Sequence, residues 1–279
     1  MKPFVLSLLV GLTSGLALTA AEATVPKHDV PAGIFPDKHL ESAVRKHVFA
    51  KRDNTDPITE EDVKNLSVIS ANGAGIRNLA GLEKCKALAQ LELANNEITD
   101  LTPLKDLANL QSLDLANNKI HDITPLASVK ALQYLNLTQN LVVNLAPVKD
   151  LTALNALYLS KNKVTDLAPL SGLNRLSSLY LDGNVVKDLT PLAALPFVSM
   201  LDLSGNQVAD LKPLAKMTSL WKLYLDRNRV ADLSPLIALA KAGQAGTPRF
   251  VTVTGNPLKA AMKTAQIAEL QKLSMTVTP

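Results

Sequence analysis

The candidate chemistry of this sequence is binding chemistry, concentrated in aromatic and charged residues between positions 134 and 227. The four tyrosines and the single tryptophan offer large contact areas with a polar group, and such side chains lose little conformational entropy on binding. Charged residues stand close to them in the sequence. The candidate ligand-binding residues are Tyr134, Tyr158, Tyr180, Trp221, Tyr224, Asp182, Asp202, Asp226 and Arg227. The alternative is that tyrosine is simply a good strand residue that packs on its neighbours.

A second series of residues, nearly all acidic, recurs along the chain, and stacked carboxylates are ligands that calcium accepts. The series consists of Asp100, Asp122, Asn144, Asp166, Asp188, Asp210 and Asp232. A proline follows each member three residues later. We favour the interpretation that each side chain caps the turn that its proline begins. The four histidines show no ligand spacing, so the sequence predicts no metal and no cofactor.

Catalytic motifs are not found in the sequence, which has no G-x-S-x-G, no phosphate-binding loop, no H-E-x-x-H and no C-x-x-C. A pair such as Asp182 and Asp202 could imitate the two carboxylates of a glycosidase. A repeat surface lacks the deep cleft that this chemistry needs. The sequence therefore predicts a protein that is not an enzyme.

The elements that must position these residues follow from a 22-residue repeat. Its register is marked by asparagines that each follow the one before by 22 residues: Asn96, Asn118, Asn140, Asn162, Asn184, Asn206 and Asn228. The first full unit starts at Leu88 and reads LAQLELANNEITDLTPLKDLAN. A fixed period of this size is the signature of a solenoid, in which each repeat packs only on its neighbours.

Each repeat is predicted to hold one short strand and one tight return. Leu91 and Leu93 alternate with other residues, which indicates a strand with one buried face, and successive strands would stack in parallel about 4.8 Å apart. The asparagine after the strand would serve buried backbone groups and stack into a ladder. Pro103 and its equivalents exclude a regular strand on the return. The few residues that remain predict a 3₁₀ turn there.

In this arrangement the tyrosines occupy outward positions on the strands. Tyr158 and Tyr180 would be direct neighbours, with Tyr134 diagonal to them. A second aromatic group, Trp221 with Tyr224, would be flanked by charged residues. These are Asp182, Asp202, Asp226 and Arg227.

Four segments are predicted along the chain. Residues 1–23 have a basic start, a short apolar run and an A-x-A-like site, as in a cleavable secretory signal peptide, with an uncleaved anchor as the alternative. Residues 24–65 would form an extended lead-in and a helical N-terminal cap. Residues 66–256 would hold the repeats: a degenerate first unit, seven regular units and one with an insertion. Residues 257–279 would form a C-terminal cap of helix and strand.

Charge and cysteine content limit the classes of function. The net charge of +4 comes from 29 basic and 25 acidic residues without a basic stripe, which disfavours nucleic acid as a partner. The single cysteine, Cys85, has no partner for a disulfide within the chain, and its apolar surroundings predict a buried thiol. After removal of the signal peptide no segment would cross a membrane. We expect a monomeric bacterial protein that is secreted or periplasmic.

The pattern LxxLxLxxNxIxDLxPL at a 22-residue period resembles the leucine-rich repeat, specifically the internalin-like or SDS22-like class. The flanking segments IFPDKHLESAVRKHV and LQKLSMTV are similar to the terminal regions of bacterial exported proteins of this class. The resemblance implies an α/β fold, a right-handed leucine-rich repeat solenoid. Parallel strands would form its concave face, 3₁₀ turns its convex face, and helices an N-terminal cap. It also implies that the ligand binds on the concave face.

The predicted function is a non-enzymatic protein-binding module with an unidentified protein partner on the concave face. A carbohydrate or cell-wall ligand on the same aromatic residues is the first alternative. The second is a phosphatase-regulating scaffold like that of the SDS22 relatives. The signal peptide argues against the second alternative, because those partners are intracellular.

Overall fold

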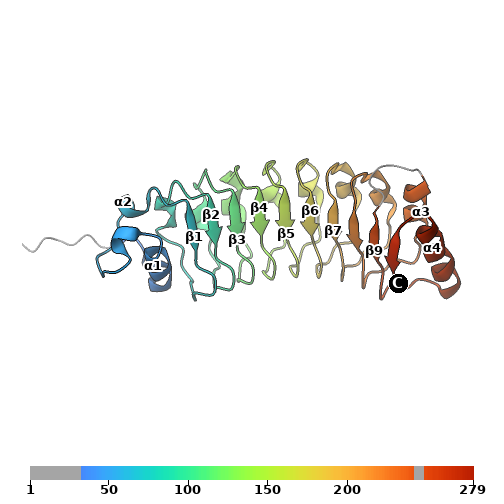
Figure 1. The fold of residues 1–279 in the computed structure, drawn as a ribbon, viewed down its shortest axis with the longest axis horizontal. Coiled ribbons are helices and arrows are strands. Elements are labelled where there is room, and N and C mark those ends of the chain that lie inside the picture. Colours follow the sequence, from blue (N-terminus) through green and yellow to red (C-terminus); the bar gives the residue numbers. More distant parts are fainter. Residues whose placement is uncertain (1–32, 242–247) are drawn as a thin grey trace, which may run out of the picture. The chain divides into compact units, whose positions relative to one another are not determined.

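The computed structural model describes residues 33–241 and 248–279, and in these residues ten short parallel strands form one sheet in chain order (Figure 1). The strands are β1 (Val68–Ser70), β2 (Gln90–Glu92), β3 (Ser112–Asp114), β4 (Tyr134–Asn136), β5 (Ala156–Tyr158), β6 (Ser178–Tyr180), β7 (Met200–Asp202), β8 (Lys222–Tyr224), β9 (Phe250–Thr252) and β10 (Thr276–Thr278). The predicted leucine-rich repeat solenoid is therefore confirmed. The predicted signal peptide, the start of the lead-in and part of the insertion lie outside the described residues.

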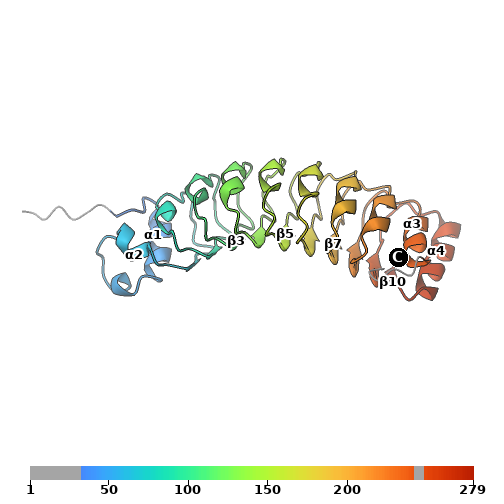
Figure 2. The same cartoon turned by 90° about the horizontal axis from the view of Figure 1, so that it is seen from above.

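The register of the sheet places equivalent residues of successive repeats side by side. Leu135 pairs with Leu157, which pairs with Leu179, and all three side chains are fully buried. Since the middle residue of each strand points inward, the leucines of all repeats form one continuous core. Figure 2 shows the strands along one side of the solenoid and the short returning helices along the other.

The returns are 3₁₀ helices in nearly every repeat, as their prolines predict. They are η2 (Leu82–Lys84), η3 (Thr102–Leu104), η4 (Thr124–Ser128), η5 (Ala146–Val148), η6 (Ala168–Leu170), η7 (Thr190–Ala194) and η8 (Lys212–Lys216). From η3 onward each has proline in its first turn. The preceding aspartate caps the turn, as in the 2.8 Å bond from the Thr102 N–H to Asp100 Oδ1. The aspartate series is thus structural, as favoured above.

The last return departs from the 3₁₀ prediction. Here α3 (Ser234–Lys241) is an α-helix of 8 residues. It belongs to the repeat that carries the insertion, and the six extra residues between Asn228 and Asn256 give the chain room for more than one helical turn.

The predicted asparagine ladder is present inside the solenoid. Asn162 is 7% exposed, and its Nδ2 donates to the carbonyls of Leu137 (2.8 Å) and Leu159 (3.0 Å). Its Oδ1 accepts the N–H of Val142 at 2.9 Å. The same three bonds recur at Asn96, Asn118, Asn140, Asn184, Asn206, Asn228 and Asn256. Each buried turn is therefore supplied with both a donor and an acceptor.

Helices precede the first strand and cover that end of the core. They are α1 (Lys38–Arg45), η1 (Phe49–Lys51) and α2 (Glu60–Val63). Asp37 caps α1 through the N–H groups of His39 and Leu40, and its other oxygen accepts the N–H groups of Arg77 and Asn78 from the first repeat. These bonds tie α1 to the solenoid.

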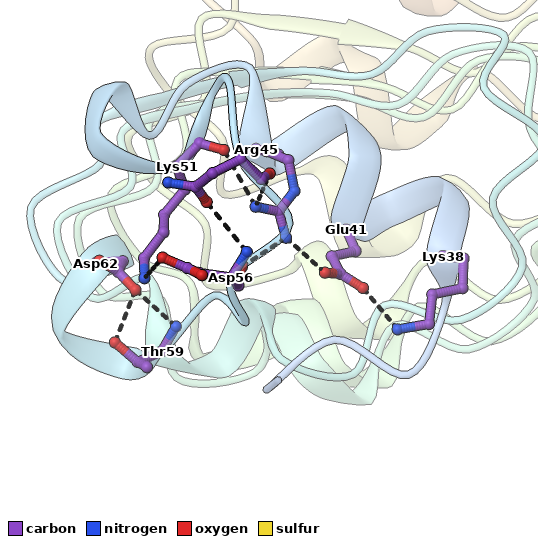
Figure 3. Close-up of polar contacts among 8 residues, drawn as sticks. Lys38, Glu41, Arg45, Lys51, Asp56, Thr59 and Asp62 are labelled. Carbon is purple, nitrogen blue, oxygen red and sulfur yellow. Dashed lines mark hydrogen bonds and ion pairs between the residues drawn. The ribbon is translucent and has the colours of Figure 1, made fainter. Parts of the chain in front are cut away.

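Arg45 organises the loop between α1 and α2, as Figure 3 shows. Its guanidinium donates to the Glu41 carboxylate at 2.8 Å and to the carbonyls of Lys51, Asn54 and Asp56 at 2.9–3.1 Å. Because a guanidinium has five N–H donors in a fixed plane, one side chain holds this entire loop against the helix.

The other end is covered by α4 (Ala260–Lys272), which is followed by β10. Gln266 of α4 accepts the N–H of Leu233 at 3.0 Å and donates to Asp232 at 2.6 Å. Leu270 is fully buried. Of the helices in the described residues, none has the length and apolar character that a membrane crossing needs.

Cys85 is fully buried, as predicted. Burial raises the pKa of its thiol to about 12, with a further contribution from Glu83. The thiol therefore remains protonated at neutral pH and acts as a small apolar side chain.

Candidate functional site: the strand face

The outward side chains of β2–β9 form a continuous surface, here called the strand face. It comprises the first and third residues of each strand and the second residue after the strand. The third residues, for example, are Glu92, Asp114, Asn136, Tyr158, Tyr180, Asp202, Tyr224 and Thr252. Their burial alternates with that of the leucines between them, because successive strand residues point to opposite sides. This surface holds the predicted concave-face residues except Trp221 and Arg227, which lie just beside it.

Three of the predicted tyrosines form a row across β4–β6. Tyr158 and Tyr180 are partners in register, and their rings stack with centroids 4.8 Å apart and planes at 10°. Tyr134 is in register with Ala156, and its ring lies 5.3 Å from that of Tyr158 at a tilt of 44°. The predicted direct and diagonal contacts are therefore confirmed. Such aromatic pairs contribute about 0.5–1.5 kcal/mol each beyond their buried area.

The hydroxyl groups of Tyr134 and Tyr180 are held in their neutral form. Partial burial raises the pKa of Tyr134, and the nearby Asp114 adds to the effect. Partial burial also raises the pKa of Tyr180, with smaller effects from Tyr158, Tyr224 and Asp202. At neutral pH these hydroxyls are available as hydrogen-bond donors to a ligand.

Three aspartates lie beside the tyrosine row and are here called the aspartate group: Asp182, Asp202 and Asp226. Asp202 is in register with Tyr180 on one side and Tyr224 on the other. Burial raises the pKa of Asp202, hydrogen bonds from Ser204 oppose this, and the charges of Asp182 and Asp226 raise it further. The aspartate group therefore concentrates negative charge beside two tyrosines, with Asp202 between them.

The aspartates are oriented by neutral donors. Asp202 accepts the N–H of Ser204 at 2.9 Å, and Asp182 accepts the hydroxyl of Ser160. Asp226 accepts the hydroxyl of Thr252 and the N–H of Thr254, both at 2.7 Å. Within the described residues, no group of three or more His, Cys, Asp or Glu side chains could hold a metal ion.

Trp221 lies just before β8 and pairs with a residue that the site prediction omitted. Its ring is 6.1 Å from that of Phe250, and the Arg249 guanidinium lies 5.0 Å from the Trp221 ring centre. Lys222 extends over Phe250 at 5.8 Å. Phe250 occupies the same outward position as Tyr134, so the repeat alignment across the insertion was the signal that could have identified it.

A shallow hollow lies at the β8–β10 end of the strand face. Its volume is about 230 Å³, and it is lined by Lys222, Tyr224, Phe250, Val251, Thr252, Thr276 and Thr278. Tyr224 therefore lies between this hollow and the aspartate group. Arg227, the last predicted site residue, is exposed at the end of β8, where its φ of 53° is in the left-handed region.

Comparison with known proteins gives matches in both sequence and structure. The family model of leucine-rich repeats in two copies matches residues 108–155 and 152–194. Internalin H of Listeria monocytogenes is 35% identical over 94 residues, a match that covers 34% of this chain and 17% of that relative. The chain thus matches less than a fifth of the length of this relative.

Two crystal structures of Listeria monocytogenes proteins extend the comparison to most of the fold. Internalin C2 has 35% sequence identity and a TM-score of 0.73, with 79% of this chain and 95% of that chain covered. The internalin InlF has 29% identity and a TM-score of 0.70, with 88% and 76% covered. The repeat, the asparagine ladder and these similarities agree, and the chain belongs to the internalin-like leucine-rich repeat proteins.

Proposed function

We propose that this chain is an exported, non-enzymatic binding module that holds a protein ligand on its strand face. The observation that carries the proposal is the row of Tyr134, Tyr158 and Tyr180. The fold is built from leucine, asparagine and proline positions and needs no large aromatic residues on an outward surface. Tyrosines that gather there offer the contact area and hydroxyl groups that are typical of binding hot spots.

The stacking geometry favours a protein over a glycan as the ligand. A sugar ring binds best on the open flat face of an aromatic ring. Tyr158 and Tyr180 are nearly parallel at 4.8 Å, so each covers one face of the other. Their exposed edges and hydroxyls suit polypeptide groups better than they suit a flat sugar. Export is proposed from the signal-peptide pattern in residues 1–23.

The test is capture of the partner in the native cell by chemical crosslinking and affinity purification. Replacement of Tyr158, Tyr180 and Tyr224 by alanine should abolish the crosslinked species that the unchanged chain gives. The matched control replaces Phe49 and Phe197 by alanine, since both are exposed aromatics that lie outside the strand face, at 85% and 61% exposure. The control should retain the crosslinked species.

Circular dichroism separates lost binding from lost folding, and all variants should give the spectrum of the unchanged chain. Capture that persists in the tyrosine variant would place the site elsewhere. A glycan array in which the unchanged chain binds sugars, and the tyrosine variant does not, would replace the protein ligand by a carbohydrate.

A further inference from the structure

The charge of the strand face is opposite in sign to that of the chain. The whole sequence has a net charge of +4. Among the strand-face residues, however, the only basic one is Lys222, and Arg227 and Arg249 lie just beside the face. The carboxylates there are Glu92, Asp114, Asp182, Asp202 and Asp226. A surface of this sign attracts basic ligands and repels acidic ones.

These carboxylates lack a basic partner within the described residues, where all ion pairs involve other acidic groups. Glu92 accepts from Ser70 and Gln90, each at 2.8 Å. Asp114 accepts the N–H of Ala116 at 2.9 Å. Neutral donors thus orient the carboxylates and leave their charge uncompensated.

The aspartate group is the place where this charge meets aromatic rings. Tyr180 and Tyr224 stand on either side of Asp202, each one strand away, so their backbones are about 9.6 Å apart at two strand spacings. An aspartate side chain is much shorter than a tyrosine side chain. A cation above Asp202 would therefore have a carboxylate beneath it and an aromatic ring on each side, and aromatic rings attract cations.

We infer that the protein bound at the strand face presents a basic segment, with an arginine or lysine side chain placed against Asp202 between Tyr180 and Tyr224. The inference rests on the function proposed above and names the chemistry of its partner. Arginine suits the place better than lysine, because its planar guanidinium can bond to a carboxylate and stack on a ring together.

Like-charge repulsion within the aspartate group supports the same conclusion. The charges of Asp182 and Asp226 both raise the pKa of Asp202, beyond the effect of its burial. A bound cation would relieve this repulsion. Part of the binding free energy would therefore come from removing the electrostatic repulsion that destabilises the unbound protein.

The test uses the full chain and a fluorescent ten-residue peptide of alternating arginine and glycine, followed by fluorescence anisotropy at two salt concentrations. The same peptide with citrulline in place of arginine keeps the shape and removes the charge. We expect at least tenfold weaker binding of the citrulline peptide, and weaker binding of the arginine peptide at higher salt.

Two matched variants locate the site. Asp182→Asn, Asp202→Asn and Asp226→Asn together should weaken binding at least tenfold. Each asparagine keeps one acceptor oxygen, so only Asp226, which accepts from Thr252 and Thr254 with different oxygens, gives up a hydrogen bond. The control makes the same changes at Asp53, Asp106 and Asp150, which are exposed and lie outside the strand face, and should stay within twofold. Tyr180→Leu with Tyr224→Leu should weaken binding severalfold. Asp202→Asn alone serves as a milder variant if the triple variant is unstable.

Equal losses in the two aspartate variants would overturn the inference, because general electrostatics would then explain the binding. Displacement of the peptide by millimolar calcium, but not by sodium at equal ionic strength, would also overturn it in favour of a metal. The native-cell crosslinking experiment separates this inference from the proposed function. If the triple asparagine variant still captures the partner and the tyrosine variant does not, the proposed function holds and this inference is wrong. If both variants still capture the partner, the proposed function and this inference are both wrong.

Discussion

The buried and outward halves of each repeat are under different physical constraints. Inside, the same position holds the same residue in repeat after repeat, as with Leu135, Leu157 and Leu179. Outside, the first strand position changes from Ser112 to Tyr134 to Ala156 without any change in the strand. Close packing and buried backbone groups dictate the interior. Folding constrains the exterior much less, which leaves binding free to select the residues there.

The strongest test of this contrast is a cavity in the interior. Leu159→Ala should lower the free energy of unfolding by roughly 2–5 kcal/mol, since the side chain is fully buried and neighbouring repeats cannot collapse into the space. Chemical denaturation followed by circular dichroism measures the loss. The outward counterpart is Ser178→Ala, which should change stability by less than about 0.5 kcal/mol. Similar losses of unfolding free energy at the two positions would show that the interior and the exterior are equally constrained.

The second test concerns the ladder. Asn162→Ala should cost about 1–3 kcal/mol for each backbone group that it leaves unpaired. The group left unpaired is the N–H of Val142, since the carbonyls of Leu137 and Leu159 each keep a bond from a neighbouring asparagine, Asn140 or Asn184. Asn174, which is exposed, provides the control for replacing asparagine by alanine, and its denaturation midpoint should hardly move. A midpoint for Asn162→Ala that matches the control would show that the buried asparagines are dispensable.

The smallest change in the free energy of unfolding is expected on the strand face. It is an increase, whereas the two interior variants lower that free energy. Asp202→Asn should raise the free energy of unfolding at neutral pH by less than about 1 kcal/mol, because the like charges of Asp182 and Asp226 near Asp202 oppose folding. Asn keeps the oxygen that accepts the Ser204 N–H. The expected gain marks Asp202 as a residue that stability alone would not retain.

The pH dependence of this gain follows from the raised pKa of Asp202, which comes from burial and the two neighbouring aspartates. Below the ordinary pKa of an aspartate the side chain is protonated in both the folded and the unfolded chain, so this ionisation costs no stability. As the pH rises through the raised pKa of the folded state, ionisation costs stability. Thermal melts should therefore show the gain of Asp202→Asn at pH 7 and its disappearance near pH 3. A gain that persists at acid pH would point to a cause other than charge.

The sequence predicts the fold well because the period constrains many residues at once. A shift of one residue would turn Leu91 outward and Gln90 inward, so only one register buries the leucines. The neighbour relations of Tyr134, Tyr158 and Tyr180 follow directly from that register. The α-helical form of α3 could not be predicted by the same means, because the insertion breaks the period there.

Contacts between parts of the chain that are distant in sequence could not be predicted from the repeat pattern either. Asp37 caps α1 locally, but its second set of bonds, to Arg77 and Asn78, depends on where α1 lies against the first repeat. The pairing of Trp221 with Phe250 and Arg249 depends likewise on how the chain returns after α3. Such contacts are set by tertiary packing and not by local spacing.

The asparagine bonds give the solenoid a direction. Asn118 donates to the carbonyl of Leu93 and accepts the N–H of Ile98, both in the repeat before its own. The asparagine side chain of each coil thus completes the turn of the coil before it, while backbone N–H groups such as that of Lys119 donate to that same preceding coil, here to the Ile98 carbonyl at 3.0 Å. The series ends where the Leu258 N–H, the counterpart of Ile98, donates to the Asn256 carbonyl. Loss of a coil from the C-terminal end should therefore leave a buried turn N–H such as that of Ile98 without its side-chain acceptor. Loss from the N-terminal end instead leaves backbone N–H groups such as those of Gln111 and Lys119 without their carbonyl acceptors.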